Sequence, residues 1–323
     1  MSDRFTVKSI FKEYEVDFNS SLDFEGDLQE FFIIDKKIAK LYRSTLKNVL
    51  KNGHTLIVEA NEFNKTIPYC ARLVEKLIKL GIRKNNRLIA VGGGVIQDIT
   101  GFIASILYRG IDWRFYPTTL LAQGDSCIGS KTSINLGKFK NLVGNFYPPS
   151  AISINVNFLR TLTASELKSG IGEMLHFYLI SGSRIAEDLK GEYEALFSSP
   201  GKLKKYILAS LGIKKRVIEI DEFDKNERNL FNYGHTFGHA IESVTGYKVK
   251  HGQAVTRGMD IANYVSLKHG YLDKGKYDYM HGILSQNLPD FKLKAHNMEA
   301  YLNALSRDKK NIGGNLGCIL TKG

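Results

Sequence analysis

The sequence predicts an α/β N-terminal domain with a mostly parallel sheet, followed by an all-α domain. In the first half of the chain, short apolar runs alternate with amphipathic helical segments. One of these runs leads directly into Gly92–Gly94, and beyond about residue 157 the periodicity is almost entirely helical. We therefore expect domains at residues 1–156 and 157–323, packed closely with a ligand cleft between them, because no Pro-, Gly- or Ser-rich linker separates them.

Each element of the first half follows from a local pattern. Phe31–Ile34 is an apolar run that stops at Asp35, which is typical of a buried strand. Apolar residues from Ile67 to Ile78 recur at helical spacing, and Gly81 ends that helix. The predicted strands are 31–34, 56–58, 88–91, 113–116 and 151–156, and the predicted helices are 38–50 and 67–78.

The second half is predicted to be helical up to its last few residues. Thr163 or Ser165 is a suitable N-cap for the first helix. The predicted helices are 163–180, 185–196, 202–220, 235–245, 253–269 and 298–305, and Gly317–Leu320 is predicted to be a strand.

Bulk composition narrows the function classes. No run of 18 apolar residues occurs, and the N-terminus has no apolar stretch, so we expect a cytoplasmic protein without a membrane span. The net charge is +12, but the Lys and Arg residues are scattered and no nucleic-acid-binding motif accompanies them, so we expect no nucleic-acid partner. The cysteines, Cys70, Cys127 and Cys318, lack paired spacing and are expected to be reduced.

Gly92–Asp98 follows a predicted strand and opens a helix. Glycines let the backbone approach a pyrophosphate, and the helix N-terminus supplies N–H groups, so this turn could bind a dinucleotide. The spacing is not Gly-x-Gly-x-x-Gly, and a plain strand–helix turn remains the alternative. Asp35, at a strand end, could accept a hydrogen bond from a ribose hydroxyl or simply cap a helix.

Glu173, His235 and His251 come from separate segments and form a candidate set of metal ligands. Two imidazoles and one carboxylate leave a coordination position open, as a catalytic zinc requires. His235 and His239 are four residues apart and share a helix face, so His239 could perform acid–base work beside the metal. The alternative is that each is an ordinary core or surface polar residue.

Two further groups of polar residues suit anions. The segment Asp125–Asn141 combines Lys131, Lys138, Lys140 and Asn141 with glycine, which suits an oxyanion, although a solvated basic loop has the same composition. Lys214 and Arg228 could hold a carboxylate.

These residues together resemble the 3-dehydroquinate synthase family and its relatives among the sugar phosphate cyclases. The resemblance extends from about residue 32 to residue 320. The strongest blocks are Gly92–Asp98, Tyr108–Gly110, Pro117–Gln123, Asp125–Asn141, Asn232–Glu242 and Asp308–Lys310.

The resemblance implies a Rossmann-like NAD domain, a helical metal-binding domain and a set of site residues. It places at NAD-contacting positions Asp35, Glu62, Lys65, Gly94, Val95, Ile96, Asp98, Thr118, Thr119, Lys140, Phe158, Thr161 and Leu162. It places Glu173, His235 and His251 at the positions that bind zinc or cobalt. Substrate or catalytic positions fall on Asp125, Lys131, Asn141, His176, Lys214, Arg228, Asn232, His239 and Lys310. Arg109 matches an arginine that reaches the substrate phosphate, together with Lys131 and Asn141, from a neighbouring subunit, which implies a homodimer.

The implied chemistry is a cyclisation in which NAD is regenerated. A ring hydroxyl is transiently oxidised, phosphate leaves, the hydride returns, and an aldol step closes a carbocycle. Lys214, Arg228 and Asn232 favour a substrate with a carboxylate. The expected reaction therefore converts 3-deoxy-arabino-heptulosonate 7-phosphate to 3-dehydroquinate and phosphate, in the shikimate pathway towards the aromatic amino acids.

Three positions depart from the usual family pattern. His176 stands where the family has Lys, Gln97 where the biosynthetic enzymes commonly have Gly, and Ser130 where a second glycine usually precedes Lys131. These departures leave open a divergent cyclase that acts on sedoheptulose 7-phosphate or glucose 6-phosphate in secondary or surface-glycan metabolism. Metal-dependent alcohol dehydrogenases share the architecture but need no phosphate-binding residues, and an inactive nucleic-acid-binding scaffold would need no metal ligands.

Overall fold

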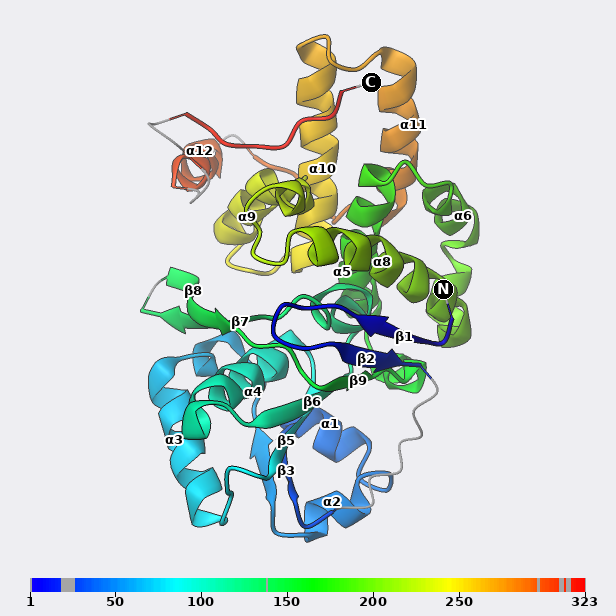
Figure 1. Cartoon of the computed structure of the whole chain (residues 1–323). Helices are drawn as coiled ribbons and strands as arrows, with labels where there is room; N and C mark the ends of the chain where they lie inside the picture. The colour runs from blue at the N-terminus through cyan, green and yellow to red at the C-terminus, as the bar shows by residue number, and fades with distance from the viewer. Residues whose placement is uncertain are drawn as a thin grey trace. The chain divides into compact units, whose positions relative to one another are not determined.

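The structure, a computed structural model, describes residues 2–18, 27–137, 139–294, 297–307, 311 and 315–322. The chain divides into two compact units (Figure 1). The first comprises residues 1–161 and 215–223, and the second comprises residues 162–214 and 224–323. The predicted fold class is confirmed, because a largely parallel sheet with helices comes first and a helical unit follows.

The first unit is built on a seven-stranded sheet with the order β1–β2–β9–β6–β5–β3–β4. The strands are β1 (Arg4–Val7), β2 (Tyr14–Asp17), β3 (Glu30–Asp35), β4 (Thr55–Val58), β5 (Arg87–Gly92), β6 (Asp112–Pro117) and β9 (Ala151–Ser153). All neighbours pair in parallel except β1 and β2, which are antiparallel. The sequence did not predict β1 and β2.

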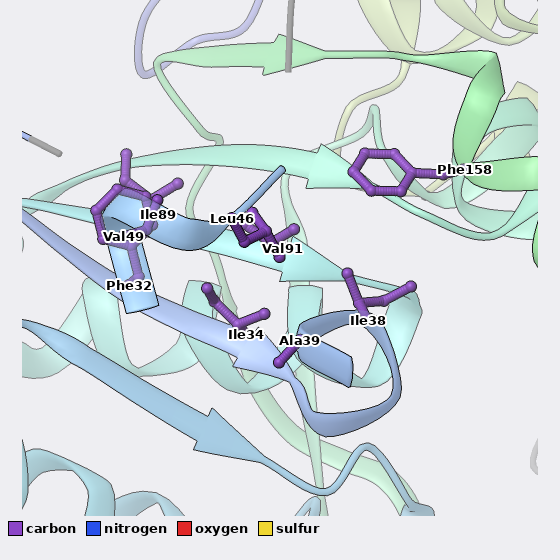
Figure 2. Packing of buried hydrophobic residues seen from close by; sticks show 9 residues of the cluster. All are labelled: Phe32, Ile34, Ile38, Ala39, Leu46, Val49, Ile89, Val91 and Phe158. Carbon is purple, nitrogen blue, oxygen red and sulfur yellow. The ribbon is translucent and has the colours of Figure 1, made fainter. Parts of the chain in front are cut away.

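Helices cover both faces of this sheet (Figure 1). Helices α1 (Lys36–Leu41) and α2 (Lys47–Lys51) lie on one face, and α3 (Ile67–Lys79) and α4 (Gly94–Ile106) lie on the other. Figure 2 shows the core on the first face, where Phe32 and Ile34 of β3 lie beside Ile89 and Val91 of β5. Alternate residues of a strand lie on the same face of the sheet. Burial of each large apolar side chain contributes about 1.5–3 kcal/mol to the stability of the fold, so this packing helps to hold β3 and β5 in register.

A separate antiparallel hairpin, β7 (Lys131–Leu136) and β8 (Phe139–Phe146), occupies the segment that was expected to be a loop. Thr132 and Ile134, two residues apart, are both buried, which is the alternation typical of a strand with one buried face. The lysines of this segment had indicated a loop instead. The described residues of this unit also form short turns of helix at Glu62–Asn64, Leu107–Arg109 and Val156–Thr161, and a π-helical turn at Ala122–Ser126.

The second unit is helical, with α10 packed against α5, α9 and α11. The helices are α5 (Ala164–Ile180), α6 (Ile185–Glu192), α7 (Ala195–Ser198), α8 (Pro200–Ile220), α9 (His235–Val244), α10 (His251–Lys268), α11 (Lys274–Leu284) and α12 (Met298–Ser306), with 3₁₀ turns at Glu227–Asn232 and Ser285–Asn287. The residues of α8 after Lys214 belong to the first unit. Among the described residues, every helix is too short or too polar to span a lipid bilayer.

Some predicted elements are corrected by the structure. The predicted strand Gly317–Leu320 is wrong, because its backbone is held by side chains: Thr236 Oγ1 donates to the Gly317 carbonyl at 3.0 Å, and Asn311 Oδ1 accepts from the Gly317 N–H at 3.0 Å. The predicted helices 38–50 and 185–196 are each broken into two shorter helices.

Candidate functional site

Three helices meet closely in the second unit, and glycines make this possible. Gly172 of α5 lies against the backbone of Gly252 of α10, and a methyl group on either glycine would overlap a backbone carbonyl of the opposite helix. Glu173 directly follows Gly172, and His251 directly precedes Gly252. The close helix contact therefore places the carboxylate of Glu173 beside the imidazole of His251.

His235 completes the group from the first residue of α9. Its Nε2 lies 3.7 Å from Oε2 of Glu173, and Nε2 of His251 lies 3.3 Å from Oε1 of the same carboxylate. Ligand atoms of all three side chains lie within 4.8 Å of one another. Ligands bound at about 2.0–2.2 Å to one tetrahedral ion are about 3.3–3.6 Å apart, so the spacing fits a single divalent cation.

Both histidines are oriented by a hydrogen bond on the opposite ring nitrogen. Nδ1 of His235 donates to the Tyr233 carbonyl at 3.2 Å, and Nδ1 of His251 donates to Oε2 of Glu242 at 2.9 Å. Such bonds fix the tautomer that keeps a lone pair on Nε2, which here is the atom facing Glu173. Sequence reasoning missed Glu242, although it lies seven positions after His235 and, like His239, can be recognised from the one-turn spacing of α9.

The electrostatic environment keeps His235 neutral. Burial lowers the pKa of His235 well below its usual value, and the nearby rings of His251, His176 and His239 lower it further. A neutral imidazole is the form that binds a metal. The donor set, the ring orientations and the charge state therefore all fit zinc or cobalt.

Two more histidines border this cluster. The ring of His239 stacks on that of His251 with 5.7 Å between centroids, and lies 5.5 Å from the ring of His235. His176 is 2% exposed, and its Nδ1 donates to the Glu173 carbonyl at 2.6 Å. The ring of His176 contacts Phe177, with centroids 4.0 Å apart, so this position is a partly aromatic environment rather than a solvated one.

In the first unit, the glycine turn lies where the strand order reverses. Strand β4 lies on one side of β3, and the next strand in the chain, β5, lies on the other. Ligands of parallel sheets bind at such a point, outside the carboxyl ends of the strands. Those ends are Asp35 in β3 and Gly92 in β5, and α4 begins at Gly94.

The glycines of this turn have different roles. A Cβ on Gly93 would lie 2.9 Å from Cγ2 of Thr119, so packing requires glycine there. A Cβ on Gly94 would meet only Oγ of Ser126, at 3.8 Å, so the protein leaves the space beside the start of α4 open. Open space beside the N–H groups of a helix N-terminus is what a dinucleotide pyrophosphate needs.

A polar network joins the first turns of α4 to the β7–β8 hairpin. Nζ of Lys65 lies 2.7 Å from Oδ2 of Asp98 and donates to Oδ1 of Asn141 at 2.5 Å. The Ser133 N–H donates to Asp98 at 2.9 Å. Burial raises the pKa of Asp98, and the charge and hydrogen bonds of Lys65 oppose that rise. The structure thus brings together Lys65, Asp98 and Asn141, which were predicted separately for cofactor and phosphate.

Most of the other residues predicted to contact the cofactor are positioned by hydrogen bonds or by burial within the first unit. Asp35 caps α1 by accepting from the Lys37 N–H at 2.9 Å, and the Thr118 N–H donates to the Gly92 carbonyl at 2.9 Å. The ring of Phe158 is fully buried in the core of Figure 2, which leaves its backbone for any ligand contact. Glu62 accepts from Asn135 and Thr161 donates to the Phe158 carbonyl, whereas Leu162 is the first residue of the second unit.

The predicted anion-binding residues differ in exposure. Arg109, Lys131 and Lys140 are exposed, and Arg109 has a left-handed backbone with φ of 64°. Lys214 and Arg228, in the second unit, are each 6% exposed. Asn232 donates to the Asn229 carbonyl at 3.1 Å, and Asp125 lies in the π-helical turn, a feature frequent at functional sites. Lys138 and Lys310 lie outside the described residues.

Comparisons with known proteins agree along the chain. Residues 55–169 match the family described as 3-dehydroquinate synthase N-terminal, and residues 170–311 match 3-dehydroquinate synthase C-terminal. The 3-dehydroquinate synthase of Clostridium tetani is 35% identical over 306 residues, which cover 93% of this chain and 79% of that protein.

Two solved structures are similar throughout. A 2-deoxy-scyllo-inosose synthase complexed with carbaglucose-6-phosphate, NAD+ and Co2+ has a TM-score of 0.89 and 26% identity, covering 98% of this chain and 91% of that one. The 2-epi-5-epi-valiolone synthase of Streptomyces hygroscopicus, with NAD+ and Zn2+ bound, has a TM-score of 0.82 and 25% identity, covering 96% of this chain and 90% of that one.

Proposed function

We propose that this chain, which belongs to the 3-dehydroquinate synthase family of sugar phosphate cyclases, is an NAD- and metal-dependent 3-dehydroquinate synthase. The observation that carries the proposal is the convergence of Glu173, His235 and His251 in a chain that is 34–35% identical to the 3-dehydroquinate synthases of Clostridium tetani and Alkaliphilus metalliredigens. The proposed reaction eliminates phosphate from 3-deoxy-arabino-heptulosonate 7-phosphate and closes the carbocycle of 3-dehydroquinate.

Glu173, His235 and His251 would hold zinc or cobalt, and the turn at Gly94 would hold NAD. When bound, the ion supplies Lewis-acid polarisation of a substrate oxygen, and the nicotinamide supplies a reversible exchange of hydride. Glu242 and the Tyr233 carbonyl keep the two imidazoles in the ligating tautomer. The solved relatives that carry NAD+ with Co2+ or Zn2+ support both assignments.

His239 would move protons in this site. Its ring stacks on His251 and lies one helical turn from His235, so it reaches the side of the metal cluster without being needed as a ligand. A histidine beside a bound hydroxyl can accept and return a proton near neutral pH. Asp125, at the π-helical turn of the first unit, is proposed as a second substrate-contacting group.

Cations would bind the two anionic groups of the substrate. Lys131 and Asn141 of the hairpin are proposed for the phosphate, together with Arg109 supplied by a second copy in a homodimer. Lys214, Arg228 and Asn232 are proposed for the carboxylate, with Lys310 as a further substrate contact. Burial of Lys214 and Arg228 would strengthen their attraction for a carboxylate, since the local dielectric is lower than that of water.

A second candidate rests on His176. The family's Lys would place a permanent cation beside Glu173, whereas His176 is buried against Phe177 and is shorter. A cyclase that acts on sedoheptulose 7-phosphate or glucose 6-phosphate remains the alternative on this ground.

The test is a comparison of substrates with one protein preparation. The protein is incubated with NAD, zinc or cobalt, and each of the three sugar phosphates, and released phosphate and the carbocyclic product are measured. The proposal expects 3-dehydroquinate from the seven-carbon keto acid phosphate, without net accumulation of NADH. If the keto acid phosphate does not react and a sugar phosphate without a carboxylate does, the alternative cyclase replaces this assignment. Formation of NADH in a stoichiometric amount would instead indicate a dehydrogenase.

A further inference from the structure

Gln97, in the first turns of α4, is more than nine-tenths buried and makes paired hydrogen bonds with one residue. Its Nε2 donates to the Ser126 carbonyl at 2.6 Å, and the Ser126 hydroxyl donates to Oε1 of Gln97 at 2.7 Å. Both ends of the amide are therefore engaged by Ser126. A buried amide satisfied at both ends fixes the two segments it joins, because losing either bond leaves a buried polar atom without its partner.

The two joined segments carry different parts of the proposed chemistry. Gln97 follows Gly94 by one turn, and its N–H donates to the Gly93 carbonyl at 3.0 Å, so it is part of the turn proposed for NAD. Ser126 ends the π-helical turn Ala122–Ser126 and directly follows Asp125. Ser126 Oγ is also the atom nearest to a Cβ built on Gly94.

The segment that leads from β6 to Ser126 is also held at its start. The Thr118 N–H donates to the Gly92 carbonyl at 2.9 Å, and Gln123 Nε2 donates to the Pro117 carbonyl at 2.9 Å. The start of the segment is thus anchored to the end of β5 and β6, and the Gln97–Ser126 pair anchors its far end, next to Asp125.

We propose that Gln97 is a positioning residue that couples NAD binding to the placement of Asp125, through its paired hydrogen bonds with Ser126. The inference rests on the proposed function, because it takes the turn at Gly94 as the cofactor site. With the pair intact, the open space beside Gly94 keeps the width that the pyrophosphate needs, and Asp125 keeps its position relative to the cofactor.

The experiment compares Gln97→Met and Ser126→Ala with the unaltered protein, and uses Ser105→Ala as a control. Ser105 lies on the same helix, and its hydroxyl donates to the Phe102 carbonyl, one turn earlier, at 2.8 Å. The dissociation constant for NAD is measured by calorimetry, the melting temperature by thermal unfolding, and kcat and KM by phosphate release. Met conserves the volume of Gln but makes no such hydrogen bonds, so a purely space-filling Gln97 predicts unchanged NAD binding.

We expect Gln97→Met to raise the NAD dissociation constant about tenfold and Ser126→Ala to raise it about threefold. Gln97→Met removes both hydrogen bonds of the pair and Ser126→Ala removes one, and the loss of each bond is expected to change the constant about threefold. The kcat at saturating NAD should also fall in both variants, because Asp125 loses its anchor, while Ser105→Ala leaves both quantities unchanged. NAD constants within twofold of the unaltered protein in both variants would overturn the inference. An unaltered protein that does not bind NAD would overturn the proposed function itself.

Discussion

Replacement of Glu242 by Gln tests how the second-unit cluster orients its metal ligands. Oε2 of Glu242 accepts from Nδ1 of His251 at 2.9 Å, and the Glu242 side chain is 13% exposed. Gln keeps the size of the side chain but removes the charge that makes His251 a more basic ligand. Loss of such a partner costs about 10–100-fold in metal affinity, or about 1.4–2.7 kcal/mol. We therefore expect the dissociation constants for both zinc and cobalt to rise by that factor.

The assay is competition between the protein and a chromophoric chelator, with thermal unfolding measured on the same samples. Asp260→Asn is the matched control, because Asp260 accepts from Nδ1 of His281 at 2.7 Å in the same unit, and neither residue belongs to the proposed metal centre. The control should leave the metal constants unchanged. A Glu242→Gln variant that binds both metals within twofold of the unaltered protein would refute the orienting role of Glu242.

Three further predictions concern separate parts of the chain. His176→Lys should raise turnover of the seven-carbon keto acid phosphate in the phosphate-release assay, and no gain would favour another substrate. Gly94→Ala should weaken NAD binding by about tenfold with little loss of stability, whereas Gly93→Ala should lower the melting temperature because of the contact with Thr119. For Asp112, burial alone would raise the pKa of the carboxyl. The hydrogen bond from Arg87 at 2.6 Å, the hydrogen bond from Ser150, and the positive charges of Lys12 and Arg87 lower this pKa overall. The pKa of Asp112 in the folded protein thus lies below its value in the unfolded chain, so the charged carboxylate stabilises the fold at neutral pH. Asp112→Asn should lower the free energy of unfolding there by about 1 kcal/mol or less, because solvent screens this partly exposed group. Denaturant unfolding should show this difference disappearing as the pH falls through the folded pKa.

Much of the fold could be predicted because its central strands are continuous apolar runs. Phe31–Ile34 and Leu88–Val91 are buried on both faces, and such runs are evident without knowledge of their partners. Strands β1 and β2 were not predicted, because each has only four residues and includes charged side chains. The β7–β8 hairpin was not predicted, because its lysines and exposed residues resemble a loop. The strand expected at Gly317–Leu320 failed for a related reason, since an apolar run cannot show that side chains such as Thr236 will satisfy its backbone.

Prediction of the candidate site from the sequence was also incomplete. Glu173, His235 and His251 could be named from residue type and context, and the structure brings their ligand atoms together. Glu242 shares a face of α9 with His235 and could have been proposed on that ground. The Gln97–Ser126 pair could not, because it joins two segments that periodicity alone does not bring together. The left-handed backbone of Ser130, with φ of 61°, explains why glycine suits that position, and its hydroxyl bonds to the buried Glu222, which no local pattern predicts.

The metal centre is tested most directly by the metal content of the unaltered protein and of His235→Ala after dialysis against zinc or cobalt. With two imidazoles and one carboxylate as ligands, the unaltered protein should retain about one ion per chain. His235→Ala should retain almost none while its melting temperature without metal stays close to that of the unaltered protein. Full metal content in His235→Ala, or no retained ion in the unaltered protein, would contradict the assignment of Glu173, His235 and His251 as the metal centre.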